Sequence, residues 1–276
     1  MRGYSEALYT PKGAGHTAPD RDMRGYSGAN DALFEAFRAW IDSEPVCKCS
    51  KGRMYTRANR EVDRIEDSHR LAMELLPELG NVSQEGINSV FIPFIDHPNI
   101  EHAGIFISAA HEKKGSKDVS FSTREGPPIS RLGYRFGRDR ILIVRADSSY
   151  YMGDEGEGTF VNYGSARSMG NLDAPGLFIN MGKVEESIGG SHADSMSLDM
   201  GSCSCYSEGT WLSRHNDKIN RFVASRNTPY EVPGVRDFLG WLAEGIDPRK
   251  SDWEIFRFLR EHDLRRMVQD LWEAAE

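Results

Sequence analysis

The chain has 276 residues, a formal net charge of −8, 39% hydrophobic and 28% charged residues, which is the balance of a folded soluble protein rather than a disordered one. The acidic balance argues against extended coating of nucleic acid, because affinity for a polyanion comes mainly from basic residues. No apolar run approaches the roughly 20 residues that span a bilayer, and the first residues lack the apolar core of a secretory signal. We therefore expect a cytoplasmic protein with no membrane partner.

Residues 1–28 are rich in Gly, Pro, Asp, Arg and Tyr and show no apolar period, which predicts a flexible arm. The arm contains the same five residues twice, Met1-Arg-Gly-Tyr-Ser5 and Met23-Arg-Gly-Tyr-Ser27. Two copies of a tyrosine-bearing docking peptide would explain the repeat. An accidental duplication, or an alternative start at Met23, is the simpler explanation.

Apolar residues at helical spacing predict two helices after the arm. The first follows Asn30, a good N-cap residue, and ends before Pro45. The second runs from about Ala58 to Leu76 and places His69 on its buried stripe, where a hydrogen-bonded core histidine is expected.

The middle of the chain is rich in β-type runs that are broken by Gly, Pro and Asp. Short strands without helices between them predict a mostly antiparallel β-sheet or barrel-like sandwich, and hence an α+β fold. The candidate strands are Val90–Ile95, Ala103–Ala109, Val119–Thr123, Arg131–Phe136, Ile141–Ala146, Thr159–Tyr163 and Leu177–Gly182.

The last third combines a Gly/Ser-rich loop with helices. Residues 185–210 are expected to form the loop, and Asn216 is expected to cap a short helix. Further helices are predicted from about Pro233, from the capping box at Ser251, and from Asp263. The predicted organisation is an arm over 1–28, an α+β core over 29–215 and a C-terminal helical subdomain over 216–276.

Two Cys-x-Cys pairs offer a structural metal site. Two short turns with thiolates could together supply the tetrahedral ligands that zinc prefers, although the usual zinc knuckle has two residues between its cysteines. Unrelated free thiols, a redox pair or an iron–sulfur site remain alternatives. The ligands of the predicted zinc site are Cys47, Cys49, Cys203 and Cys205.

A second cluster of metal-ligand types surrounds one predicted turn. His97, His102 and Asp96, with Asp194 from elsewhere, could hold a second divalent metal, because imidazole and carboxylate suit zinc, iron or manganese. Such a metal lowers the pKa of a bound water, for which Glu101 or His192 would be the general base. The alternative is a set of solvated surface-turn side chains.

Arginines and acidic residues lie near this cluster in the sequence. Arg124, Arg131 and Arg135 could bind a small anionic substrate, since guanidinium forks match phosphate and carboxylate. The acidic turn Gly153-Asp-Glu-Gly-Glu-Gly158 could attract a hard cation, or could simply be a solvated turn.

Two functions fit these patterns. The first is a metal-dependent intracellular enzyme, specifically a hydrolase of a phosphate- or carboxylate-bearing substrate, with a separate structural zinc. The second is a non-enzymatic binding or assembly protein, such as a component of a virus or a larger complex, that uses its arm and its C-terminal helices. A homo-oligomer is compatible with both.

Overall fold

The computed structural model describes most of the chain after the arm. The described residues are 28–43, 58–122, 128–147, 151–170, 174–189, 192, 194–206, 209–213, 218–222, 230–231 and 234–274.

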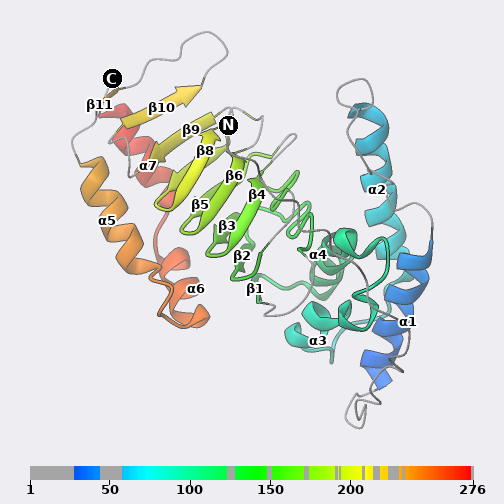
Figure 1. Ribbon diagram of the computed structural model, residues 1–276. Coiled ribbons are helices and arrows are strands. Elements are labelled where there is room, and N and C mark those ends of the chain that lie inside the picture. Colours follow the sequence, from blue (N-terminus) through cyan, green and yellow to red (C-terminus); the bar gives the residue numbers. More distant parts are fainter. Residues whose placement is uncertain are drawn as a thin grey trace, which may run out of the picture.

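The centre of the molecule is a parallel β-solenoid, in which the chain winds through two sheets (Figure 1). The larger sheet has the strand order β1-β2-β3-β5-β7-β9-β10-β11, and the smaller one has the order β4-β6-β8. Neighbouring strands from β1 to β9 are parallel, whereas β10 is antiparallel to β9 and β11 to β10. The strands are β1 Asp118–Phe121, β2 Ile141–Val144, β3 Thr159–Asn162, β4 Ser165–Met169, β5 Leu177–Asn180, β6 Lys183–Ile188, β7 Met196–Asp199, β8 Ser202–Tyr206, β9 Gly209–Ser213, β10 Lys218–Phe222 and β11 Tyr230–Glu231.

Three successive turns of the solenoid, after β3, β5 and β7, bend at an Asx-x-Gly corner that stacks on the next. Asn162, Asn180 and Asp199 occupy successive register positions and are fully buried. The amide of Asn162 donates to Asn180 Oδ1 at 3.0 Å, and the amide of Asn180 donates to Asp199 Oδ1 at 2.8 Å. Buried polar side chains are tolerated when they are paired in this way, and the ladder fixes the register of the coils.

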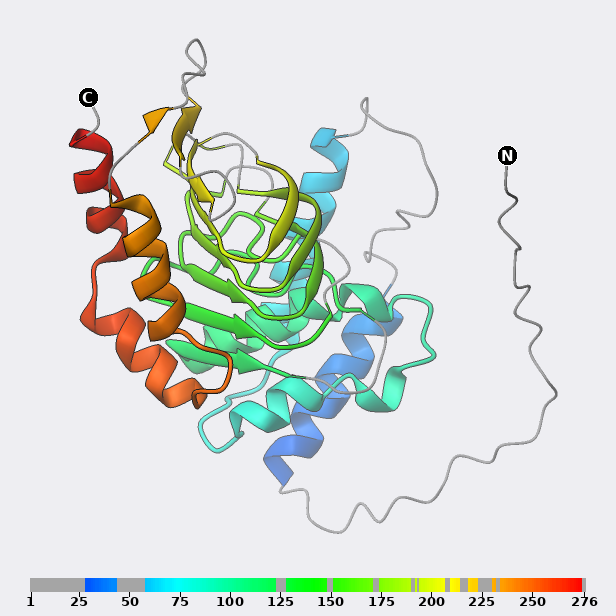
Figure 2. The same cartoon turned by 60° about the vertical axis from the view of Figure 1, so that its left-hand side comes forward.

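Helices cover the solenoid from two sides (Figures 1 and 2). Leu142, Val144, Phe160 and Phe178 point into the core that also contains the N-terminal helices. The opposite face of the large sheet packs on the C-terminal helices α5–α7. The helices are α1 Gly28–Asp42, α2 Ala58–Leu75, α3 Gln84–Ser89, α4 Ala103–Lys114, α5 Val235–Gly245, α6 Asp252–Glu261 and α7 Leu264–Glu273, with the 3-10 turns η1 Ile92–Phe94 and η2 Ile100–His102.

The expected antiparallel sheet or sandwich is wrong, because the stacked coils run parallel. Parallel pairing normally needs a long crossover, and here the smaller sheet supplies it. Both faces of the large sheet are covered, so its strands are continuous apolar runs such as Leu177–Asn180 rather than alternating ones.

Two of the expected strands are helical instead. Val90–Ile95 lies at the end of α3 and in η1, and Ala103–Ala109 lies in α4. Every residue of α4 from Ala103 to His111 is buried, so the helix is apolar all round and has no amphipathic period. A short apolar run of this kind cannot be assigned to helix or strand from its pattern alone.

The remaining expectations about helices, strands and loops are confirmed in part. The first two helices, the capping box at Ser251 and the cap at Asp263 are confirmed. The strand expected at Arg131–Phe136 is a series of turns, and the helix expected after Asn216 is replaced by strand β10. The segment 185–210, expected to be a loop, contributes β6, β7 and β8 to the solenoid.

Candidate functional site

The predicted ligands of a second metal sit in separate local contacts. His97 Nε2 lies 3.4 Å from Asp42 Oδ1 at the end of α1, and His102 Nε2 lies 3.4 Å from Glu101 Oε1. His102 is buried, whereas Asp96 is exposed in the turn before His97.

The remaining predicted residues of this site lie on the solenoid. His192 and Asp194 precede β7, where the backbone N–H of Asp194 donates to His192 Nδ1 at 3.1 Å. Within the part of the chain that the structure describes, no three His, Cys, Asp or Glu side chains are grouped so that they could hold a metal ion.

The predicted zinc site is described only in part. Cys203 is partly buried on β8, and Cys205 follows on the same strand. Cys47 and Cys49 lie outside the described residues, as does Arg124. The structural zinc and the metal-dependent hydrolase therefore stay predictions.

The other two predicted substrate arginines belong to a polar cluster that joins the turns before β3 to helix α2. We call it the first-coil cluster, and its charged members are Arg131, Arg135, Asp154, Glu155 and Glu66. Arg131 forms a buried ion pair with Asp154. Arg135 Nε donates to Glu155 Oε2 at 2.8 Å, and its NH1 lies 3.3 Å from Glu66 Oε1 on α2. Arg131 and Arg135 were expected to bind an anion, and the turn that contains Asp154 and Glu155 was expected to bind a cation. In the structure the two arginines pair with the two carboxylates, so the opposite charges compensate each other.

The backbone of this first-coil cluster is strained. All the non-glycine residues with positive φ in the described chain lie in it: Arg131, Arg135, Tyr151 and Glu155, with φ between 51° and 63°. Such conformations cost about 1 kcal/mol or more each and persist only where the surroundings enforce them. Here the surrounding ion pairs enforce them, and the guanidinium of Arg131 also stacks 4.9 Å from the ring centroid of Tyr151.

A histidine, a tyrosine and a glutamate extend the cluster to α2 and α4. His69 Nε2 lies 3.1 Å from Glu112 Oε2, and this contact lowers the pKa of Glu112. The ring of His69 packs edge-on against Tyr134 at 5.3 Å. Burial and the charge of Glu155 raise the pKa of Tyr134, so its phenol stays protonated. These contacts join α2 to α4 and to Tyr134, and so hold the N-terminal helices against the solenoid.

We expect Asp154→Asn to destabilise the fold by about 3 kcal/mol, because it leaves the buried guanidinium of Arg131 without its counter-charge. Urea denaturation would measure the loss. As a control, Glu185→Gln breaks the exposed pair with Lys183 and should leave the midpoint unchanged. Equal effects of the two substitutions would contradict a fastening role for the cluster.

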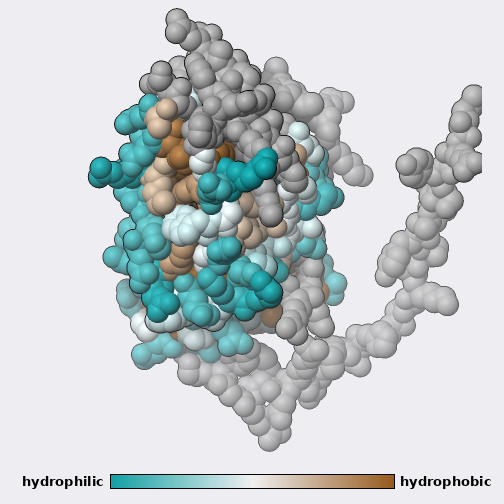
Figure 3. Space-filling view, turned by 90° about the vertical axis from the view of Figure 1, so that its left-hand side faces the viewer, coloured by the Kyte–Doolittle hydropathy of each residue, from teal (hydrophilic) through white to brown (hydrophobic). Residues whose placement is uncertain are grey.

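None of the site residues predicted from the sequence lines the cavity that lies between α5 and α7. It has a volume of about 570 Å³ and is lined by Asp237, Phe238, Trp241, Met267, Asp270 and Leu271. Figure 3 looks at this side of the molecule and shows apolar surface bordered by hydrophilic residues. We call it the α5–α7 groove.

The groove has an apolar floor and an acidic rim. Trp241, Met267 and Leu271 are partly exposed although they pack on the core, and Phe238 lies beneath them. Asp237 on α5 and Asp270 on α7 are exposed, one on each helix. Phe238 and Trp241 are three residues apart and Met267 and Leu271 four, so each pair shares one helix face. This spacing is the sequence signal that could have located the groove.

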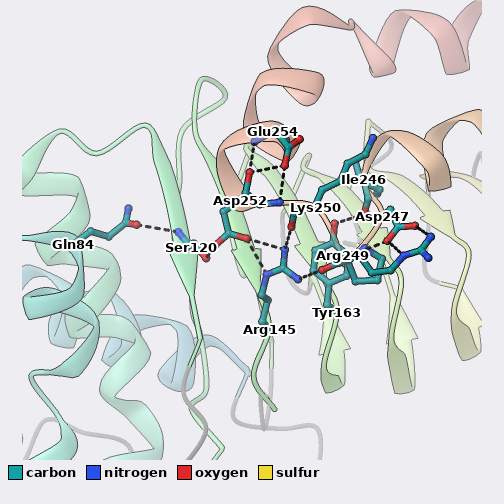
Figure 4. Close-up of polar contacts among 12 residues, drawn as sticks. Gln84, Ser120, Arg145, Tyr163, Ile246, Asp247, Arg249, Lys250, Asp252 and Glu254 are labelled. Carbon is teal, nitrogen blue, oxygen red and sulfur yellow. Dashed lines mark hydrogen bonds and ion pairs between the residues drawn. The ribbon is translucent and has the colours of Figure 1, made fainter.

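A polar network holds the C-terminal helices against the solenoid (Figure 4). Arg145, just beyond β2, donates from Nε to Asp252 Oδ1 at 2.8 Å, and from NH1 and NH2 to the carbonyls of Pro248 and Lys250. The hydroxyl of Ser120 on β1 donates to the other oxygen of Asp252. These contacts hold the turn between α5 and α6, and the first residue of α6, against the sheet.

The chain matches no protein-family model, no curated protein and no solved structure. Among the described helices, none combines the length and apolar character needed to cross a membrane. The function therefore has to be argued from the geometry alone.

Proposed function

We propose that this protein is a non-enzymatic binding protein of a larger assembly, and that the α5–α7 groove docks an apolar segment carrying a basic residue. The observation that carries the proposal is the groove itself, an apolar hollow with a partly exposed tryptophan and an aspartate on each wall. Exposed apolar surface rimmed by polar residues is characteristic of interaction sites.

The residues of the groove suit a protein partner. Trp and Met are enriched at the centres of interfaces, and Met adapts its shape to different side chains. Asp237 and Asp270 favour a partner with Arg or Lys beside its apolar side chain, because a like charge there would be repelled.

The arginines and the histidine that were predicted to bind substrate or metal support a binding function, because they form ion pairs with neighbouring carboxylates. Arg131 and Arg135 are engaged with Asp154 and Glu155, and His97 pairs with Asp42. None of these contacts involves a residue that lines the α5–α7 groove, and the lining residues that the structure describes include no histidine, cysteine, serine or arginine.

Peptide binding tests the proposal. A synthetic amphipathic peptide of Leu and Lys should bind the full-length protein and shift the NMR signals of Met267 and Leu271. The same peptide with Glu in place of Lys should bind at least tenfold more weakly, because the rim is acidic. Asp237→Lys/Asp270→Lys, which changes only exposed side chains, should reverse this preference.

Trp253 provides a matched control. It is 65% exposed on α6 but does not line the groove, so Trp253→Ala should leave peptide affinity unchanged. Binding that survives the double Lys substitution with its preference for Lys, or that depends on Trp253, would overturn the proposal.

A further inference from the structure

We infer that the partner segment is the Met-Arg-Gly-Tyr-Ser repeat of another copy of this chain, so that the protein assembles with itself by inserting its arm into the α5–α7 groove of a neighbour. The inference rests on the proposed function and names its ligand.

The repeat has the chemistry that the groove selects. Each copy, Met1–Ser5 and Met23–Ser27, supplies one methionine, one arginine and one tyrosine and no acidic residue. Met and Tyr fit a floor made of Phe238, Trp241, Met267 and Leu271, because thioether–aromatic and aromatic–aromatic contacts are favourable. An arginine fork can pair with a rim carboxylate, and the glycine lets the peptide backbone turn between the two anchors.

Chain geometry directs the second repeat to a neighbouring copy. Met23 is five residues from Gly28, where α1 begins, so it can lie at most about 17 Å away. The groove is on the far side of the large sheet, since α1 packs in one core and α5 and α7 pack in the other. Helix α4, the sheet and the C-terminal helices each add about 10 Å, so the groove is about 30 Å from α1. Figures 1 and 2 both show this separation.

The resulting contact is heterologous, because the arm of one copy meets a different surface of the next. Such contacts continue from copy to copy unless the geometry closes a ring. Two repeats in one arm allow a single chain to engage two grooves, which strengthens the assembly through effective concentration.

Sedimentation velocity of the full-length protein tests the inference over a range of concentrations. The unmodified chain should form species larger than a monomer. Tyr4→Ala/Tyr26→Ala in the arm should weaken association at least tenfold, and so should Asp237→Lys/Asp270→Lys at the rim. An unmodified chain that stays monomeric throughout would overturn the inference, as would association that is indifferent to the arm substitutions.

Mixing the arm variant Tyr4→Ala/Tyr26→Ala with the groove variant Asp237→Lys/Asp270→Lys tests directly whether the arm enters the groove. The arm variant keeps its groove and the groove variant keeps its arm, so together they should form a complex of one groove variant with one or two arm variants and grow no further. Leu271→Glu offers a second groove variant for the same mixture. If the mixture contains only monomers, the arm does not enter the groove.

The peptide experiments separate the two proposals. A peptide of residues 1–10 should compete with the Leu/Lys peptide for the groove. Binding of the Leu/Lys peptide without competition from residues 1–10 would refute self-assembly through the arm and leave the docking function standing. Failure of both peptides would refute both.

Discussion

Replacing Gly182 by alanine should prevent the solenoid from forming the corner Asn180-Met-Gly182, the second of the three, and destabilise the protein by more than about 4 kcal/mol. A Cβ at this position would overlap the carbonyl oxygen of Gly164 in the preceding corner and lie 2.8 Å from the carbonyl carbon of Tyr163. Both neighbours are backbone atoms, so no side chain can move aside. The Asn ladder next to them would be pulled out of register as well.

Gly240→Ala is the matched control, because nothing lies within 4 Å of a Cβ placed there and the residue is in the helix α5. Alanine is favoured over glycine in a helix by up to about 1 kcal/mol, so this variant should be equally or more stable. Circular dichroism during thermal unfolding would compare both with the unmodified chain. A Gly182→Ala protein that melts at the unmodified temperature would show that the corners are not stacked as described.

The second large effect is a loss of stability in mild acid that depends on His111. This residue of α4 is fully buried, its Nε2 lies 2.8 Å from Asn88 Oδ1 on α3, and its Nδ1 lies 3.3 Å from Ser116 Oγ. Burial, followed by the charges of Arg140 and Lys114, lowers its pKa to about 3. A neutral ring that donates to Asn88 and accepts from Ser116 satisfies both nitrogens.

The sign of the pH dependence follows from the unfolded state, in which the histidine has its ordinary pKa of about 6.5. Below that pH the unfolded chain binds a proton that the folded one refuses, so stability is complete above about pH 6.5 and falls toward pH 3. For His111 this shift corresponds to about 2 kcal/mol lost by pH 5 and about 5 kcal/mol over the whole window.

Chemical denaturation from pH 8 to pH 5 would measure the contribution of His111. The stability difference between the unmodified chain and His111→Gln should shrink by about 2 kcal/mol over that range, because glutamine does not titrate. Ser116→Ala should lower stability but keep the pH dependence, since the buried imidazole is still present. A difference that stays constant with pH would show that His111 accepts a proton in the folded protein.

Local signals in the sequence were sufficient for the helices that face solvent on one side. Ser251 and Asp263 cap their helices, and the capping box at Ser251 forms with Glu254 as its sequence predicts. The helix expected to follow an Asn30 cap begins at Gly28 instead, so Asn30 lies inside its first turn. These elements are encoded within a few residues, so neighbouring parts of the fold do not alter them.

The candidate sites were less predictable, because their side chains meet through contacts distant in sequence. Arg131 and Asp154 were assigned separately to anion and cation binding, and only the folding of two loops onto each other made them partners. The α5–α7 groove depends likewise on how two helices separated by α6 lie on the sheet. A helix pattern reveals which face is apolar, but not whether a neighbour covers it fully.

The sequence by itself determined the capped helices at Ser251 and Asp263. It also contains Asn162-Tyr-Gly, Asn180-Met-Gly and Asp199-Met-Gly once per coil, but only the structure shows that these segments are stacked corners. Only the tertiary structure decided that the strands between those corners stack in parallel and that the run Ala103–Ala109 is a helix. The reason is physical: an apolar segment buried on all sides satisfies its hydrogen bonds as helix or as strand, and the choice depends on what packs around it.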